Sequence, residues 1–150
     1  PLDAAITQIQ LADRSFDEEG FVSGARAAFE MVVDSFASGD TDTLQSLLSD
    51  DVYENFAAAI HERVSKDQTH ETTMVGFDVT EIIEAEMEGR NALVTVKYVS
   101  DQVNVTRNSE GEIVEGDPVA VTRITDIWTC ARDVSSPNPN WVLIATRSPN

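Results

Sequence analysis

The chain has 150 residues, of which 41% are hydrophobic, and its formal net charge is -17 from 27 acidic and 10 basic residues. This length fits one domain with one substantial core, and the apolar content excludes an intrinsically disordered tail. The charge excludes nucleic acid as a partner, because phosphate binding requires a basic surface. The longest apolar runs, at 56–60 and 141–145, are far shorter than the ~20 residues of a membrane span.

The start of the chain has helical periodicity. Leu2, Ile6 and Ile9 recur at helical spacing and predict a short amphipathic helix within residues 1–14. The segment Ser15-Phe16-Asp17-Glu18 has a capping-box pattern, which predicts that a second helix starts there. The apolar stripe of this second helix consists of Phe21, Ala25, Phe29, Val32 and Phe36.

Two further helices are predicted after a glycine break. Gly39 has the position of a helix C′ glycine, and Asp40 can cap a short helix after it. Ser49-Asp50-Asp51 is an acidic start signal for a longer helix that ends near Lys66. The polar segment 67–71 is predicted to be a loop. The stripe of the longer helix consists of Val52, Phe56, Ala59, Ile60 and Val64.

From residue 72 onward the hydrophobic period changes to two, which predicts strands. A long strand is expected over 72–87 with Val75, Phe77 and Val79 on one face, although the glutamates of 81–86 also suit a helix. Helices followed by antiparallel strands favour an α+β domain, in which helices close a bent sheet and leave an apolar pocket. The other expected strands are 92–100, 103–106, 119–132 and 141–146, with turns at 88–91, 108–111 and 115–118 and a loop at 135–140.

Six segments, taken in order, resemble one known family. They are 16–25, 37–40, 47–56, 114–117, 126–133 and 137–141. Together they are similar to the C-terminal domain of subunit 44 of the mitochondrial inner-membrane translocase and to its bacterial relatives. The resemblance implies a nuclear-transport-factor-2-like cone, with N-terminal helices packed on a strongly curved antiparallel sheet of about four strands. We therefore expect a single domain over 1–150, with the amphipathic helix at 1–14 and a core domain at 16–146.

The resemblance also implies a function. It implies a membrane-associated binding or scaffold domain that holds a lipid acyl chain or an apolar peptide in a hydrophobic pocket and is linked to protein translocation or membrane protein assembly. The implied partners are a membrane lipid or a membrane-associated protein, with a chaperone or translocase implied by the family alone. The implied location is the inner membrane, peripheral or tethered, facing the cytoplasm in a bacterial relative or the matrix in a mitochondrial one. The acidic balance favours a bacterial relative.

The pocket is predicted to lie between the apolar stripes of the helices and strands. Its candidate ligand-binding residues are Phe29, Val33, Phe36, Phe56, Ile60, Phe77, Val96, Trp128 and Trp141. For docking on a membrane, Arg14, Arg26, Arg63 and Lys66 either form a basic patch or are scattered surface charges.

We expect no enzyme, no cofactor and no metal site. The sequence has neither a cysteine pair nor a His-x₃-His spacing, and it has no glycine-rich phosphate loop. The alternative is a small-molecule enzyme of the cone fold with Asp126 or His61 as its base. Cys130 lies in an alternating apolar stretch, which favours a small core residue over a reactive thiol.

Overall fold

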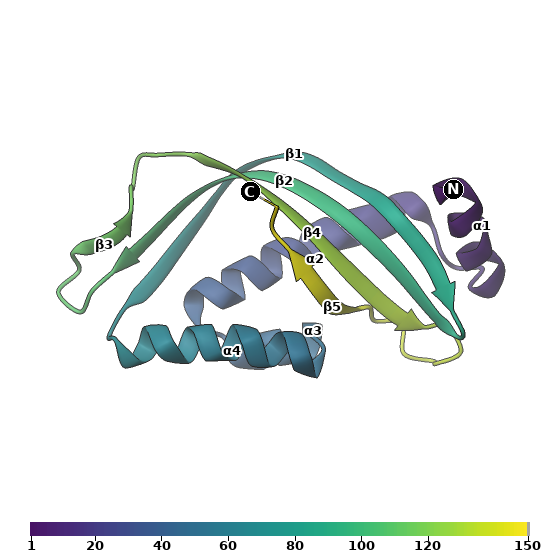
Figure 1. The fold of residues 1–150 in the computed structure, drawn as a ribbon, viewed down its shortest axis with the longest axis horizontal. Helices are drawn as coiled ribbons and strands as arrows, with labels where there is room; N and C mark the ends of the chain where they lie inside the picture. Colours follow the sequence, from purple (N-terminus) through teal and green to yellow (C-terminus); the bar gives the residue numbers. More distant parts are fainter. Residues whose placement is uncertain (150) are drawn as a thin grey trace.

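The computed structural model describes residues 1–149 and has four helices packed on a curved sheet of five strands. The long strands arch over α2, and α4 crosses the open side of the arch (Figure 1). The helices are α1 (Leu2–Ala12), α2 (Glu18–Ser38), α3 (Thr41–Leu47) and α4 (Asp50–Ser65). The strands are β1 (Thr69–Glu88), β2 (Asn91–Arg107), β3 (Ile113–Gly116), β4 (Thr122–Asp133) and β5 (Val142–Arg147).

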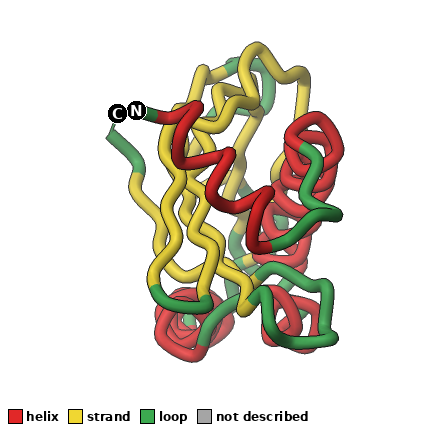
Figure 2. The backbone as a smooth tube through the Cα atoms, turned by 90° about the vertical axis from the view of Figure 1, so that its right-hand side faces the viewer, coloured by secondary structure: helices red, strands yellow, loops and turns green. Residues whose placement is uncertain are grey.

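The sheet is antiparallel throughout, which confirms the predicted α+β cone. Its strands have the order β1-β2-β4-β5, and β3 pairs with the C-terminal end of β2. In the view turned by 90°, the strands form one layer, and α1 lies across the end of the sheet nearest the viewer (Figure 2). α1 contacts β1 and buries Ile6 and Ile9, so this helix is part of the core.

The start of α2 differs from the sequence prediction. Its N-cap is Asp17, whose carboxylate accepts a hydrogen bond from the backbone N–H of Gly20. Ser15, the expected cap, instead donates its backbone N–H and its hydroxyl to Asp13. Serine and aspartate are both good caps, so the pattern gave two possible starts, and the fold uses the second.

The remaining helix ends follow the local signals. Gly39 ends α2 with φ at 77°, the left-handed conformation in which glycine carries no steric penalty. The side chains of Asp40 and Ser49 accept backbone hydrogen bonds at the starts of α3 and α4. Lys66 is the C-cap residue of α4, as the sequence predicts.

The predicted face of β1 is wrong, because the strand contains bulges. The register against β2 shifts on either side of Phe77 and again within the segment 81–86, all of which is strand. An extra residue moves the side chains that follow it to the opposite face. Phe77 therefore packs edge-on against Phe29 in the core, whereas Val75 is 55% exposed.

Three strand boundaries also differ from the predictions, because pairing across the sheet decides them. β1 begins inside the predicted loop, where Thr69 pairs with Arg107 of β2. The strands expected at 92–100 and 103–106 are one continuous β2. Residues 119–121 precede β4 and are exposed.

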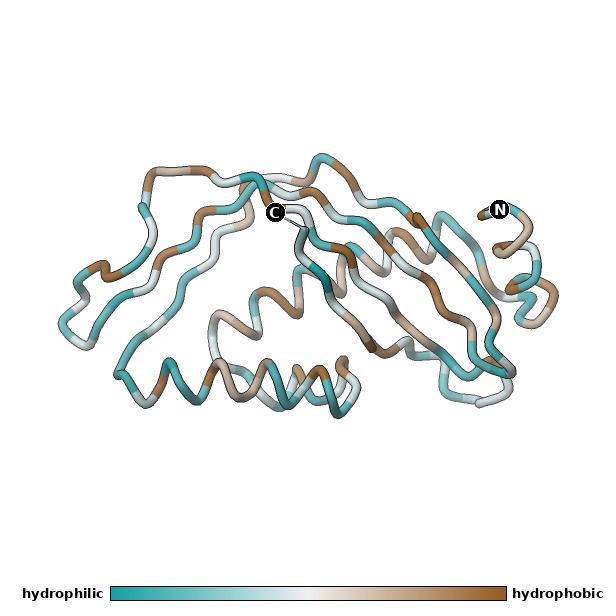
Figure 3. The backbone as a smooth tube through the Cα atoms, viewed as in Figure 1, coloured by the Kyte–Doolittle hydropathy of each residue, from teal (hydrophilic) through white to brown (hydrophobic). Residues whose placement is uncertain are grey.

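The core lies between α2 and the concave face of the sheet. Phe29 is fully buried, and its ring centroid lies 4.3 Å from that of Tyr98 and 4.5 Å from that of Trp128. The Tyr98 hydroxyl donates to the carbonyl of Ala25 at 3.1 Å, and burial raises the pKa of Tyr98 well above its usual value. Hydrophobic and hydrophilic residues alternate along α4 and the long strands (Figure 3), as expected for elements with one face on this core.

Candidate functional site

A cavity of about 560 Å³ lies between the first half of α2, the concave face of β4 and the loops at one end of the sheet. This volume is in the range of small-molecule sites, about 300–1,000 Å³. The wall is mainly apolar, and charged and amide side chains lie among the loop residues that line it. The lining includes Phe16, Phe21, Trp128, Cys130, Arg132 and Trp141.

An aromatic cluster forms one wall of the cavity. The Trp141 ring lies 4.8 Å from that of Phe21 and 6.1 Å from that of Phe16, measured between centroids. Phe16 and Phe21 are themselves 5.6 Å apart. With Asp17 as N-cap, they occupy the N′ and N4 positions of a hydrophobic staple, which fixes the direction in which the chain enters a helix. The start of α2 and the segment before β5 thus meet at this wall.

Alternate residues of β4 line the deeper part of the cavity. Tyr98 of β2 is paired with Asp126 of β4, so both side chains lie on the same side of the sheet. Trp128 and Cys130 follow Asp126 at alternate positions and therefore lie on that side too. Burial raises the pKa of the Cys130 thiol to about 11. The thiol is therefore protonated at neutral pH and acts as a small apolar group in the cavity wall.

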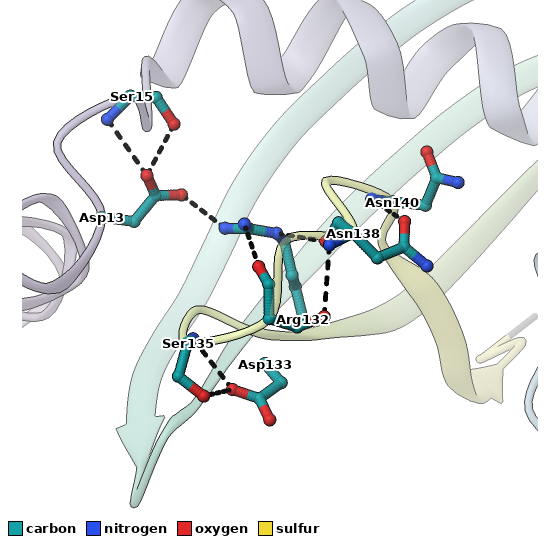
Figure 4. Close-up of polar contacts among 8 residues, drawn as sticks. Asp13, Ser15, Arg132, Asp133, Ser135, Asn138 and Asn140 are labelled. Carbon is teal, nitrogen blue, oxygen red and sulfur yellow. Dashed lines mark hydrogen bonds and ion pairs between the residues drawn. The ribbon is translucent and has the colours of Figure 1, made fainter.

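An ion pair between Arg132 and Asp13 forms part of the cavity lining (Figure 4). Arg132 Nη1 donates to Asp13 Oδ2 at 2.7 Å, and the two side chains are only 12% and 14% exposed. Arg132 also donates to the carbonyls of Asn138 at 3.2 Å and Ser136 at 3.4 Å. The hydrogen bonds from Ser15, and then the charge of Arg132, hold the pKa of Asp13 below its usual value despite burial.

Two of the nine predicted pocket residues, Trp128 and Trp141, line this cavity. Phe29 and Val96 are fully buried in the core beneath it. An amphipathic pattern marks every residue that faces inward, and it does not distinguish a filled core from the wall of an open cavity.

The other predicted pocket residues lie elsewhere. Phe36 and Phe56 pair edge-on between α2 and α4 at 5.3 Å, Ile60 is buried nearby in α4, and Val33 is partly buried against the core. Phe77 borders a second hollow of about 700 Å³ between α2 and β1. These residues therefore do not form a single site with the two tryptophans.

Sequence reasoning missed the residues that the loops bring to the cavity. Phe16 and Phe21 had a usable signal, the staple spacing, but it becomes visible only when Asp17 is taken as the cap. Asp13 and Arg132 are separated by 119 positions, and no local pattern links residues so far apart.

The two candidate bases lie outside the cavity lining. His61 is exposed on α4. Asp126 is half-buried on β4, where its carboxylate accepts the hydroxyl of Ser148 at 2.8 Å and burial raises its pKa. Within residues 1–149, no group of three or more His, Cys, Asp and Glu could hold a metal ion.

Three of the four bases considered for membrane docking have partners within the domain. Arg26 pairs with Glu30, and Lys66 pairs with Glu62, each four residues away on its own helix. Arg63 donates to backbone carbonyls at the end of α2. In the part of the chain that the structure describes, no helix has both the length and the apolarity to cross a membrane.

A family model described as Tim44-like domain matches residues 2–148. Among curated relatives, the probable mitochondrial import inner membrane translocase subunit tin-44 of Caenorhabditis elegans is 25% identical over 143 residues. The mitochondrial import inner membrane translocase subunit TIM44 of Homo sapiens is 24% identical over 139 residues. These alignments cover 93% and 92% of this chain but 34% and 31% of the relatives, so the chain spans about a third of their length.

A solved structure with a similar fold is the intermembrane space region of the chloroplast protein ARC6. Its TM-score is 0.58 at 11% sequence identity, and the match covers 89% of this chain and 96% of that chain. At this low identity the likeness concerns the fold alone, a set of helices on a strongly curved sheet.

Proposed function

The chain belongs to the Tim44-like domain family, and from this membership we propose that it is a membrane-associated binding domain of a protein-translocation or membrane-protein assembly system. It takes a lipid acyl chain or an apolar peptide segment into the cavity beneath the curved sheet. Its partners are a membrane lipid or a membrane-associated protein, and a chaperone or translocase as partner follows from the family alone.

The apolar cavity is the observation that supports this proposal. Its aromatic wall, formed by Phe16, Phe21 and Trp141, and the neutral thiol of Cys130 present apolar surface to an open space of about 560 Å³. Covering such surface is favourable by roughly 25 cal/mol per Å². A flexible alkyl chain or an aliphatic side chain can do this without a polar partner in the wall.

The names of the relatives support the proposed location. They are named as subunits of the mitochondrial import inner membrane translocase. We place this chain at an inner membrane, peripheral or tethered, on the matrix side in a mitochondrion or the cytoplasmic side in a bacterium. That it is a bacterial relative stays a prediction.

Quenching of tryptophan fluorescence by brominated stearic acid tests the proposed ligand. Bromine quenches on contact, and both tryptophans of the chain, Trp128 and Trp141, line the cavity. We expect saturable quenching by this probe. A peptide of leucines with one brominated phenylalanine tests the second ligand class in the same assay.

Two neighbouring alanines of α2 provide a matched pair of variants. Ala28 lines the cavity, whereas Ala27 is exposed on the same helix. Ala28→Phe fills space in the cavity and should weaken quenching by both probes, and Ala27→Phe should leave quenching unchanged. Equal binding by the two variants, or no saturable quenching of the wild-type chain, would refute the proposed site.

A further inference from the structure

We propose that Arg132 is the positioning residue of the cavity mouth, because it ties together the two loops that frame the mouth and so sets the width of ligand that enters. The first is the junction loop, residues 13–17 between α1 and α2. The second is the β4–β5 loop, residues 134–141. The inference rests on the proposed function, since it concerns access to the same cavity.

Both loops contribute directly to the cavity lining. Asp13, Ser15, Phe16 and Asp17 line the cavity from the junction loop, and residues 139–141 line it from the β4–β5 loop. Each loop carries one ring of the aromatic wall. The rings of Phe16 and Trp141 are in contact, with centroids 6.1 Å apart, so a wide ligand enters between the loops only if they move apart.

Arg132 binds both loops from the end of β4 (Figure 4). It reaches the carboxylate of Asp13 in the junction loop and the carbonyls of Ser136 and Asn138 in the β4–β5 loop. Within residues 1–149, every hydrogen bond and ion pair found between the two loops runs through this guanidinium. A planar guanidinium holds several acceptors in a fixed arrangement, which a lysine ammonium on a flexible stem does not do.

The other polar contacts of the two loops do not join one loop to the other; the Val134 N–H, for example, donates to the carbonyl of Arg90 at 2.9 Å. In the junction loop, Ser15 binds Asp13 and the Phe16 N–H donates to the Asp13 carbonyl. In the β4–β5 loop, Asn138 Oδ1 accepts the N–H of Asn140. Such bonds keep the shape of each loop but not the distance between them. Without the Arg132 contacts, the ring contacts of Trp141 with Phe16 and Phe21 still join this end of the structure, but no polar bond holds the two loops together, so they can move apart more easily.

Two variants release the tie in different ways. Asp13→Asn removes the charge, while its amide oxygen can still accept from Ser15. Arg132→Lys keeps the charge but loses the fixed set of donors, so it separates geometry from electrostatics. The matched control is Arg107→Met. Arg107 also forms an ion pair, with Glu71 at 3.1 Å, and also donates to the carbonyl of a loop residue, Gly111. It does not line the cavity.

The experiment measures the association rates of a slim and a wide probe with the full chain by stopped-flow fluorescence. The slim probe is cis-parinaric acid, a single conjugated acyl chain, and the wide probe is bis-anilinonaphthalenesulfonate. Asp13→Asn and Arg132→Lys should raise the rate of the wide probe by about tenfold and that of the slim probe by less than about twofold. Arg107→Met should change neither rate. Equal changes for both probes in Arg132→Lys would overturn the proposal, because they would indicate a general loosening of the fold.

A measurement without ligand distinguishes failure of this inference from failure of the proposed function. In a Trp128→Phe background, Trp141 is the sole tryptophan, and acrylamide quenching reports its exposure at the mouth. Arg132→Lys should increase this quenching, and Arg107→Met should not. If neither probe binds the wild-type chain, the proposed ligand class is wrong. In that case, increased quenching still supports Arg132 as the tie, and unchanged quenching overturns it.

Discussion

Replacing Phe29 by alanine should remove a large part of the stability of the domain. The side chain is fully buried and packs against Tyr98 and Trp128, with a third ring, Phe77, at 5.6 Å. Truncation of a buried phenylalanine to alanine costs about 3–5 kcal/mol. The three ring contacts, each worth about 0.5–1.5 kcal/mol beyond burial, favour the upper end of that range. The whole free energy of unfolding of a globular domain is roughly 5–15 kcal/mol.

Urea unfolding, followed by circular dichroism and by tryptophan fluorescence, measures this loss. In thermal unfolding, the same loss of free energy should lower the midpoint of Phe29→Ala by roughly 6–20 °C. Met31, which is 48% exposed two residues further along α2, provides the control, since Met31→Ala should change the unfolding free energy by less than about 0.5 kcal/mol. A loss below about 1.5 kcal/mol for Phe29→Ala would mean that the residue lines an open space, as the sequence first suggested, and would refute its assignment to the core.

Three further changes test separate features of the fold. Gly24→Ala should raise the free energy of unfolding by about 1 kcal/mol, because Gly24 lies within α2 and a Cβ there meets no atom within 4 Å; unchanged or lower stability in urea would contradict this. Gly116→Ala should cost about 1–3 kcal/mol and speed amide exchange in β3, since φ is 89° and the new Cβ would clash with the carbonyl of Asn104. Asp126→Asn should raise the thermal midpoint at pH 7, because burial raises the pKa of Asp126, and the ionised native carboxyl then costs stability as pH rises through that pKa. The gain should vanish near pH 3, where the carboxyl is protonated in both the folded and the unfolded state; a gain that does not depend on pH would contradict this cause.

The sequence predicted the helices well because their ends depend on neighbouring residues. The caps at Asp40 and Ser49 and the left-handed glycine at Gly39 act within one turn of the helix that they bound. The same local character explains the error at Ser15, which offers a cap two residues before the one in use. The choice of Asp17 as cap coincides with the packing of Phe16 against Trp141 of another segment.

The candidate site was predicted only in part. Trp128 and Trp141 were identified and do line the cavity, but Phe36, Phe56 and Ile60 lie outside its lining and pack with the main core. All five are apolar and face inward, and this is all that periodicity reports. Which inward residues meet another side chain and which meet open space depends on how far apart the helices and the sheet lie.

By itself, the sequence determined the family, the α+β order and the ends of most helices, because these follow from composition and from patterns of a few residues. Only the tertiary structure decided the faces of β1, since the bulges around Phe77 arise from pairing with β2. It also decided the cavity mouth, where Asp13 and Arg132 meet across 119 positions. Contacts between distant segments depend on the packing of the whole chain, and short-range patterns do not encode them.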